Sequence, residues 1–371
     1  MGFAAFGAFW GTWGASLPRV QSHAAVTDAE LGLALLWVGG GALASIWWAG
    51  RLSDRFDRGV VAWSTAALAG AGVLTVFARG VAQLSIALLV VGICSGAADA
   101  AINAAATRAE GGGGAVVNLA HGVFSVAVVA SSLGVAAAAR NGEGGRPWAL
   151  IAIGVLLVVA AVVSIKLSTP APVEVRAQTG PHRRWSPQLL ILGGLAALAY
   201  LVENAWQSWG AIQLHTSVGA SLGISALAPA VFASSAAAGR FAGHALTNAV
   251  PAATLFALGA VTAAGGSALG ALAPSTALVL LGIAVAGLGT SVCAPTLIGL
   301  AGQSAPDARG NATGAVITIA YLGFVFGPAA VGLVSGAATL PIALVGVAVI
   351  AGVLVLASPI LAKLDTYGAK P

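Results

Sequence analysis

The sequence predicts an all-α polytopic membrane protein, with 12 transmembrane helices in two six-helix bundles related by a parallel repeat. Composition is the first observation behind this fold class: of 371 residues, 58% are hydrophobic and only 7% are charged, and the mean hydropathy is +0.96. Soluble domains carry roughly 25% charged residues. The other two observations are the length of the apolar runs and a pattern that occurs twice.

Apolar runs of membrane-spanning length fill the chain, since a helix needs about 20 mostly apolar residues to cross the bilayer core. In the first half they are Gly2–Leu17, Leu31–Gly50, Val60–Phe77, Val81–Ala106, Val116–Ala139 and Pro147–Ile165. In the second half they are Leu189–Ile212, Ser225–Ala242, Ala252–Leu272, Thr276–Leu300, Gly314–Val334 and Pro341–Leu361. The runs are continuous rather than alternating, which excludes a β-barrel.

The segments between the runs read as loops. The first helix is expected to end before Pro18, so that a loop from Pro18 to Glu30 precedes the second helix. The first run is short, so either the first helix is short or the true start lies upstream of Met1. A charged stretch, Gly50–Gly59, separates the second and third runs, and the glycine run Gly111–Gly114 separates the fourth and fifth.

A duplicated pattern indicates two related halves. Trp10-Gly-Thr-Trp13-Gly-Ala in the first helix matches Trp206-Gln-Ser-Trp209-Gly-Ala in the seventh. The ends of the second and eighth helices match as well, both reading Gly-Arg. Six helices followed by six in the same orientation are parallel repeats. We therefore expect an amino-terminal bundle over 1–166, a cytoplasmic linker rich in Pro, Thr and basic residues over 167–187, and a carboxy-terminal bundle over 188–371.

The distribution of Lys and Arg predicts the orientation, because these residues concentrate in cytoplasmic loops. With both termini in the cytoplasm, all Lys and Arg lie on the cytoplasmic side except Arg19, Arg79, Arg140 and Arg146. We therefore expect a multi-pass protein of a bacterial-type inner (plasma) membrane. The excess of positive charge reflects this topology and contacts with anionic lipid, so the bilayer is the expected partner and nucleic acid is not.

The charged stretch between the second and third runs carries a family resemblance. It contains Gly50, Arg51, Asp54, Arg55 and Arg58, and its Gly-x-Leu-x-Asp-Arg pattern resembles the loop after the second helix of the major facilitator superfamily, a large family of secondary transporters. The resemblance implies that Asp54 and the arginines form a charge network between helices. Such a network biases the equilibrium between two access states, so this stretch is the predicted conformational switch loop.

A looser resemblance is to the fucose-permease-like bacterial branch of the superfamily. It rests on the segments Gly96–Asn103, Asn118–Gly122 and Tyr200–Glu203, together with Trp209.

Two carboxylates inside predicted helices are candidates for proton coupling or substrate binding. A charge near the bilayer centre is costly and is retained mainly where it faces a cavity or a partner. Asp99 has Asn103 one turn later, and Glu203 has Gln207 on the same face. The alternative is a protonated, hydrogen-bonded carboxyl that holds helices together. His121 could relay protons, or equally cap a helix end.

Aromatic residues of two equivalent helices are candidates for a substrate cavity. The family resemblance implies that the first and seventh helices line a central cavity, which would present Trp10, Trp13, Trp206 and Trp209, with Tyr321 from the eleventh helix. Indole rings stack on sugars or flat aromatics, whereas the alternative for tryptophan is the interfacial belt. The Gly327-Pro328 pair resembles the kinked segment of many family members. Pro328 frees a backbone carbonyl that neighbouring residues must satisfy.

The predicted function is an ion-gradient-driven, proton-coupled secondary transporter that moves a small solute, for example a sugar, by alternating access. The alternative is a drug or multidrug efflux pump working by proton antiport. It is weakened because the fourth helix lacks arginine and the fifth lacks a Gly-Pro pair. A non-transporting membrane sensor is less favoured. The sequence holds no nucleotide-binding motif, catalytic constellation or metal-ligand pattern. We therefore expect neither an enzyme nor a cofactor, and we expect a monomer.

Overall fold

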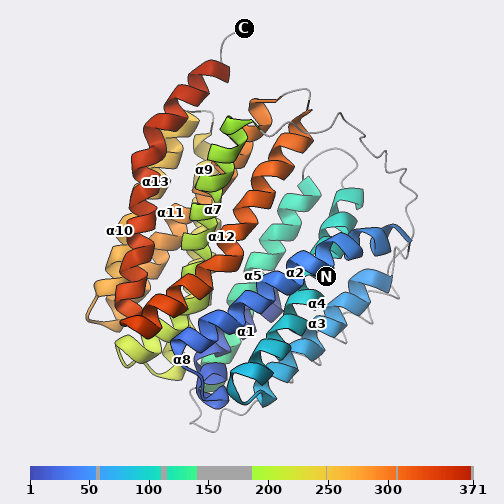
Figure 1. Cartoon of the computed structure of the whole chain (residues 1–371), viewed down its shortest axis with the longest axis vertical. Helices are drawn as coiled ribbons and strands as arrows, with labels where there is room; N and C mark the ends of the chain where they lie inside the picture. The colour runs from blue at the N-terminus through green and yellow to red at the C-terminus, as the bar shows by residue number, and fades with distance from the viewer. Residues whose placement is uncertain (56–58, 110–114, 140–185, 248, 306–307, 369–371) are drawn as a thin grey trace. The chain divides into compact units, whose positions relative to one another are not determined.

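A computed structural model describes residues 1–55, 59–109, 115–139, 186–247, 249–305 and 308–368, and the regular elements in these ranges are all helices (Figure 1). The all-α prediction is confirmed for this part of the chain. The helices are α1 (Gly2–Ala24), α2 (Asp28–Arg55), α3 (Gly59–Phe77), α4 (Gly80–Ala109), α5 (Ala115–Ala139), α7 (Pro187–Ile212), the π-helix η1 (Gln213–Ser217), α8 (Leu222–Ser225), α9 (Ala228–Leu246), α10 (Ala252–Leu272), α11 (Thr276–Gln303), α12 (Arg309–Ala337) and α13 (Leu340–Gly368).

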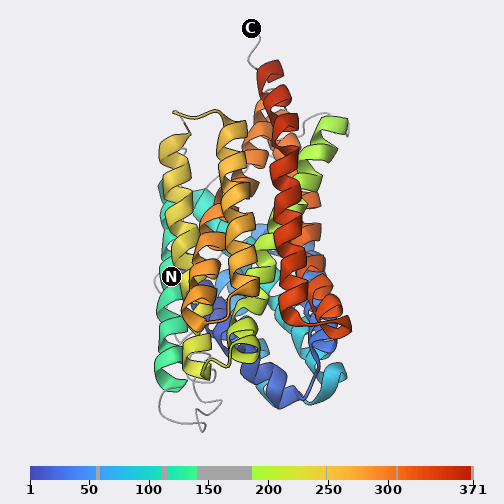
Figure 2. The same ribbon diagram turned by 90° about the vertical axis from the view of Figure 1, so that its left-hand side faces the viewer.

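The helices fall into two compact units. In the first unit α2 packs along α4, α1 along α5, and α3 against α4 (Figure 1). In the second unit α7 packs against α11 and α12, while α10 lies between α11 and α13 (Figure 2). Residues 219–230 belong to the first unit. There Ala226 of α8 packs with Ala15 of α1 and with Val135 and Ala136 of α5.

Within the described residues, eight helices are long and apolar enough to cross a membrane: α4, α5, α7 with η1, α8 with α9, and α10 to α13. The sixth expected helix, 147–165, and residues 167–185 of the expected linker lie outside the described residues. The count of twelve crossings therefore stays a prediction.

The first helix is longer than the sequence predicted, because Pro18 lies inside α1 rather than ending it. A proline removes only its own N–H from the helical ladder, and the residues after it can continue the helix. The helix ends at Ala24, where Ala25 adopts the left-handed conformation with φ 53° and its N–H bonds back to Ser22. The loop predicted over Pro18–Glu30 is thus reduced to Ala25–Thr27.

The second helix also extends beyond its predicted bounds. The Thr27 N–H donates to the Glu30 carboxylate at 2.8 Å, and the Glu30 N–H bonds back to the Thr27 hydroxyl at 3.3 Å. This reciprocal arrangement caps the helix start, and the bond from the Thr27 N–H lowers the pKa of Glu30. At its other end α2 runs to Arg55 rather than stopping at Gly50. Most of the predicted switch loop is therefore the last turns of a helix.

Close approach of helix backbones holds each unit together. In the second unit, a Cβ at Gly323 of α12 would overlap the carbonyl oxygen of Ala197 in α7. In the first unit, a Cβ at Gly11 of α1 would overlap the carbonyl oxygen of Val128 in α5. Small residues permit such contact where the helices cannot be driven together by the hydrophobic effect. The α1–α5 pair of the first unit corresponds in the repeat to the α7–α12 pair of the second. The glycine lies on α1 in the first pair but on α12, the counterpart of α5, in the second.

Candidate functional site

An ion pair in the second unit is the centre of the candidate site. Glu203 of α7 is 8% exposed, and its Oε1 lies 3.3 Å from Nη2 of Arg240 on α9. The Gln207 side chain, one turn further along α7, donates to the same carboxylate oxygen at 3.1 Å. Arg240 lies within α9, which continues to Leu246. The Glu203 carboxylate thus has a charged donor from α9 and a neutral donor from its own helix.

Further polar groups surround this pair. Tyr200, one turn before Glu203 on α7, and Tyr321 of α12 lie within electrostatic range of one another, and Glu203 and Arg240 lie within range of Tyr200. The thiol of Cys293 on α11 is within range of Glu203. Side chains of α7, α9 and α11 therefore lie around one carboxylate, and Tyr321 of α12 lies near Tyr200.

Two other side chains of α7 bond the backbone of α12 around Pro328. Pro328 has no N–H, so the carbonyl of Phe324, four residues earlier, loses its helical partner. The Asn204 side-chain amide donates to that carbonyl. The Trp209 indole donates to the Pro328 carbonyl at 3.1 Å. The sequence prediction that neighbours satisfy the freed carbonyl is confirmed, and α7 supplies the partner.

Trp206 and Trp209 lie in the interior of the second unit, with 1% and 0% of their surfaces exposed. The Trp206 indole donates to the Ser267 hydroxyl of α10 at 2.8 Å. Both indole N–H groups are therefore bonded within the unit and both rings are covered by protein. This geometry favours a packing role for these two residues over the substrate contact predicted from the sequence.

A second polar cluster lies in the first unit. The Asn103 amide donates to Oδ1 of Asp99 at 2.9 Å, one turn earlier on α4. His121 of α5 lies within electrostatic range of Asp99 and packs on the ring of Phe3 from α1, with ring centroids 5.0 Å apart. The structure thus brings His121 of α5 close to Asp99 and Asn103 of α4, which the sequence already placed one turn apart.

Trp10 and Trp13 of α1 stand edge to face, with ring centroids 5.8 Å apart. Trp10 is half-buried and also packs on Phe9, with centroids 5.3 Å apart. Trp13 is 4% exposed, and its indole nitrogen has no hydrogen-bond partner in the described part of the chain. Its counterpart Trp209 is bonded, so the equivalent tryptophans differ between the units.

The predicted switch loop is described only in part. Gly50, Arg51, Asp54 and Arg55 belong to the last turns of α2, and Arg58 lies outside the described residues. No cluster of three or more His, Cys, Asp or Glu suited to a metal ion occurs among the described residues.

Arg240 is the site residue that sequence reasoning missed. Its position near the expected end of the eighth helix predicts a cytoplasmic positive charge and not a partner for Glu203. Two signals could have revealed its role: it is the only Arg or Lys in that run, and Glu203 is the only acidic residue in the seventh. A single acid and a single base in two apolar helices of one bundle favour pairing.

Long apolar helices in two compact units, with ionisable side chains held inside each, define a multi-pass membrane transport protein. The chain belongs to the major facilitator superfamily, whose family model matches residues 1–328.

Comparison with known proteins supports this assignment. An uncharacterized transporter of Sinorhizobium fredii is 29% identical over 371 residues, covering 97% of this chain and 96% of the relative. An uncharacterized MFS-type transporter of Yersinia pestis is 27% identical, covering 89% and 86%.

Solved structures share the fold. A bacterial homolog of the human lysosomal transporter Spinster superposes with a TM-score of 0.81 at 17% identity, covering 100% of this chain and 96% of that one. The D-xylose–proton symporter gives 0.73 at 16% identity, covering 100% and 98%.

Proposed function

We propose that this protein is a proton-coupled secondary transporter that moves a small polar solute, for example a sugar, by alternating access. The observation that carries the proposal is the Glu203–Arg240 pair. A carboxylate held inside a membrane-spanning helix is retained mainly for a function, and here a fixed positive charge and the Gln207 amide lie beside it.

Proton binding at Glu203 would change the charge of the site by one unit. With Glu203 ionised, the pair is neutral; with Glu203 protonated, Arg240 is an unpaired cation within the unit. The two protonation states therefore favour different arrangements around Arg240, as a ligand-driven population shift requires. The cluster of Asp99, Asn103 and His121 is the corresponding candidate in the first unit.

The proposed solute class rests on polar groups beside aromatic rings. Asp99 and Asn103 can bond hydroxyls, and the half-buried Trp10 offers a ring for stacking. Proteins of the same fold include a D-xylose–proton symporter and a nucleoside transporter. We accordingly propose a sugar-like or nucleoside-like solute, a monomer, twelve crossings, and both termini on the cytoplasmic face of a bacterial-type inner membrane.

The proposal is tested with purified protein in two steps. First, D-xylose, L-fucose, uridine and a cationic drug are screened by thermal shift at two pH values, because a bound ligand stabilises the folded protein by mass action. The stabilising compound is then followed into proteoliposomes with an imposed pH gradient. Symport predicts accumulation inside when the outside is acidic.

Glu203→Gln is the decisive variant, with Asp28→Asn at the start of α2 as the control. Without a titratable group at 203, we expect gradient-driven accumulation to be lost while exchange of labelled for unlabelled solute persists. Accumulation at the wild-type level in Glu203→Gln would refute the coupling role. Stabilisation by the cationic drug alone, with proton-driven export, would replace symport by efflux.

A further inference from the structure

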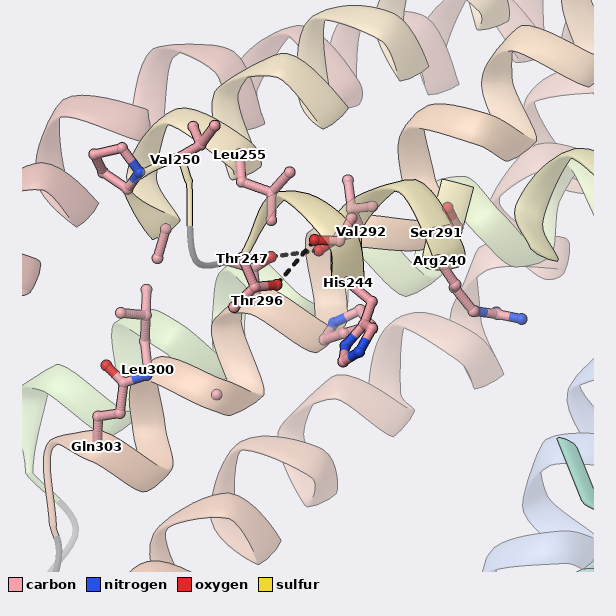
Figure 3. Close-up of a pocket in the computed structure, with 15 residues that line it drawn as sticks. Arg240, His244, Thr247, Val250, Leu255, Ser291, Val292, Thr296, Leu300 and Gln303 are labelled. Carbon is pink, nitrogen blue, oxygen red and sulfur yellow. Dashed lines mark hydrogen bonds between the residues drawn. The ribbon is translucent and has the colours of Figure 1, made fainter. Parts of the chain in front are cut away.

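A pocket of about 480 Å³ lies within the second unit, between α9, α10 and α11 (Figure 3). Arg240 lies at one end of it, while Gln303 and Leu300 lie at the other. Gln303 is the last residue of α11, and the connection between α9 and α10 supplies Val250 and Pro251. The pocket therefore opens where α9 and α11 end and α10 begins.

The pocket extends along α9 and α11 from this opening. Its α11 wall runs from Gln303 back to Ser291, a stretch that rises about 18 Å at 1.5 Å per residue. At the other end the Arg240 side chain, which is 49% exposed, lines the pocket, and the same guanidinium bonds Glu203 at 3.3 Å. Arg240 thus contacts both the pocket and the buried carboxylate.

The lining combines apolar residues with polar ones and contains no acidic residue. Its ionisable members are Arg240 and, one turn later on α9, His244. In the repeat, Gly243 occupies the position that Asp54 occupies in the first half. A Cβ at Gly243 would lie 2.6 Å from Cγ1 of Val292 on the facing helix. A side chain at 243 would therefore crowd the pocket wall, and glycine keeps it open.

Three hydroxyl groups along the pocket can bind water. Thr247, Thr296 and Ser291 each donate to a carbonyl of their own helix, at 2.9, 2.6 and 2.8 Å. Each hydroxyl oxygen is left with lone-pair capacity. A pocket lined by such acceptors and by an imidazole can hold water.

We propose that this pocket is the aqueous route by which protons reach and leave the Glu203–Arg240 pair. The inference rests on the proposed function, because it needs Glu203 as the coupling group. A proton released by the Glu203 carboxyl passes to water beside Arg240 and then to water at the opening, with His244 as a relay on the way. The carboxylate that remains is stabilised by the Arg240 guanidinium. The route lies within one unit.

The groups that face Glu203 are compatible with this role. They are Tyr200 on its own helix, Cys293 of α11 and Arg240 of α9, and Tyr321 of α12 lies within range of Tyr200. His244 lies one turn after Arg240 on α9, and its imidazole can donate and accept hydrogen bonds. Because it lines the pocket, it is the group best suited to pass protons between Glu203 and the solvent.

Cysteine accessibility tests the route directly. In a background with Cys94→Ala and Cys293→Ala, Thr296→Cys places a thiol in the pocket wall, and Thr262→Cys on an exposed face of α10 is the control. The reagents are an anionic and a cationic methanethiosulfonate that cannot cross the membrane. We expect Thr296→Cys to react at least tenfold faster than the control. Each reagent's rate is divided by its rate with a free thiol in solution. By this measure the anionic reagent should react faster than the cationic one, since Arg240 gives the lining a positive charge.

Modification should also block the route. Attachment of the reagent at Thr296→Cys is expected to lower gradient-driven uptake at least fivefold while solute exchange is unchanged. His244→Gln should slow gradient-driven uptake several-fold by removing the relay.

Failure of this inference is distinguishable from failure of the proposed function. An unreactive Thr296→Cys, as expected if lipid chains fill the pocket, would overturn the route while leaving proton coupling in place. Full modification with undiminished uptake would overturn it too. Absence of proton-driven uptake in the protein with its original sequence would instead refute the proposed function.

Discussion

The bond from Asn204 to the carbonyl freed by Pro328 gives a quantitative prediction about stability. Asn204→Leu keeps a similar shape but removes the donor, so the Phe324 carbonyl is left unpaired inside the unit. Leaving a buried acceptor unsatisfied costs about 1–3 kcal/mol, whereas side-chain hydrogen bonds between membrane helices average about 0.6 and reach about 1.7 kcal/mol. We expect the free energy of unfolding to fall by about 1–2 kcal/mol. The preceding residue on α7 is the ion-paired Glu203, so the helix has little freedom to relax around the unpaired carbonyl.

Pro328→Ala supplies the second arm of a double-mutant cycle. Alanine restores the N–H at 328, which can donate to the Phe324 carbonyl in the regular helical pattern. The Trp209 bond is to the backbone oxygen of residue 328 and needs no proline. In the Pro328→Ala background, Asn204→Leu should therefore cost less than about 0.5 kcal/mol, a coupling of about 1 kcal/mol or more.

The assay is reversible unfolding by SDS in mixed micelles, followed by circular dichroism. Ser208→Ala serves as the control, because Ser208 is the other side-chain partner of Asn204, at 3.4 Å, and its loss should cost little. If Asn204→Leu costs the same with and without Pro328, the bond does not compensate for the proline, and the reasoning is refuted.

Three further outcomes follow from the packing and the switch loop. Trp206→Phe keeps the ring contact but loses the bond to Ser267; we expect a stability loss of about 1–2 kcal/mol in SDS unfolding with solute affinity unchanged, and a large affinity loss would restore the substrate role. Gly323→Ala should prevent normal folding, seen as aggregation in size-exclusion chromatography, because its Cβ would overlap the Ala197 carbonyl; wild-type behaviour would show that α7 and α12 can separate. Asp54→Asn should lower the turnover number while solute affinity stays within a few-fold, and unchanged turnover would count against a switch.

Much of the fold follows from local sequence patterns. Apolar runs located the helices because burial in lipid demands continuous apolar surface. Their ends were less accurate. Pro18 was given too much weight, since proline removes one bond and does not by itself end a helix. The Thr27–Glu30 pair carried a capping signal that would have placed the start of α2 correctly.

The candidate site was predicted in part. Asp99, Asn103 and Glu203 stood out because charged and amide groups are rare in apolar runs. The pairing of Glu203 with Arg240 was not apparent, since it depends on how α7 and α9 are turned in the bundle. The rotation of α7 also buries Trp206. Its match to Trp10 in the repeat predicted that the two residues occupy equivalent positions, but it could not predict that Trp206 is buried while Trp10 is half-buried.

The hydrogen bonds from α7 to the backbone of α12 around Pro328 should hold these two helices at a fixed separation. Asn204 and Trp209 hold backbone carbonyls on either side of the proline, and Gly323 brings the helix axes into backbone contact. Spin labels placed one on each helix should keep a constant separation while the transporter cycles. Distances measured from this pair to other helices would then report displacement of those helices alone, which gives spectroscopic work on this protein a fixed frame of reference.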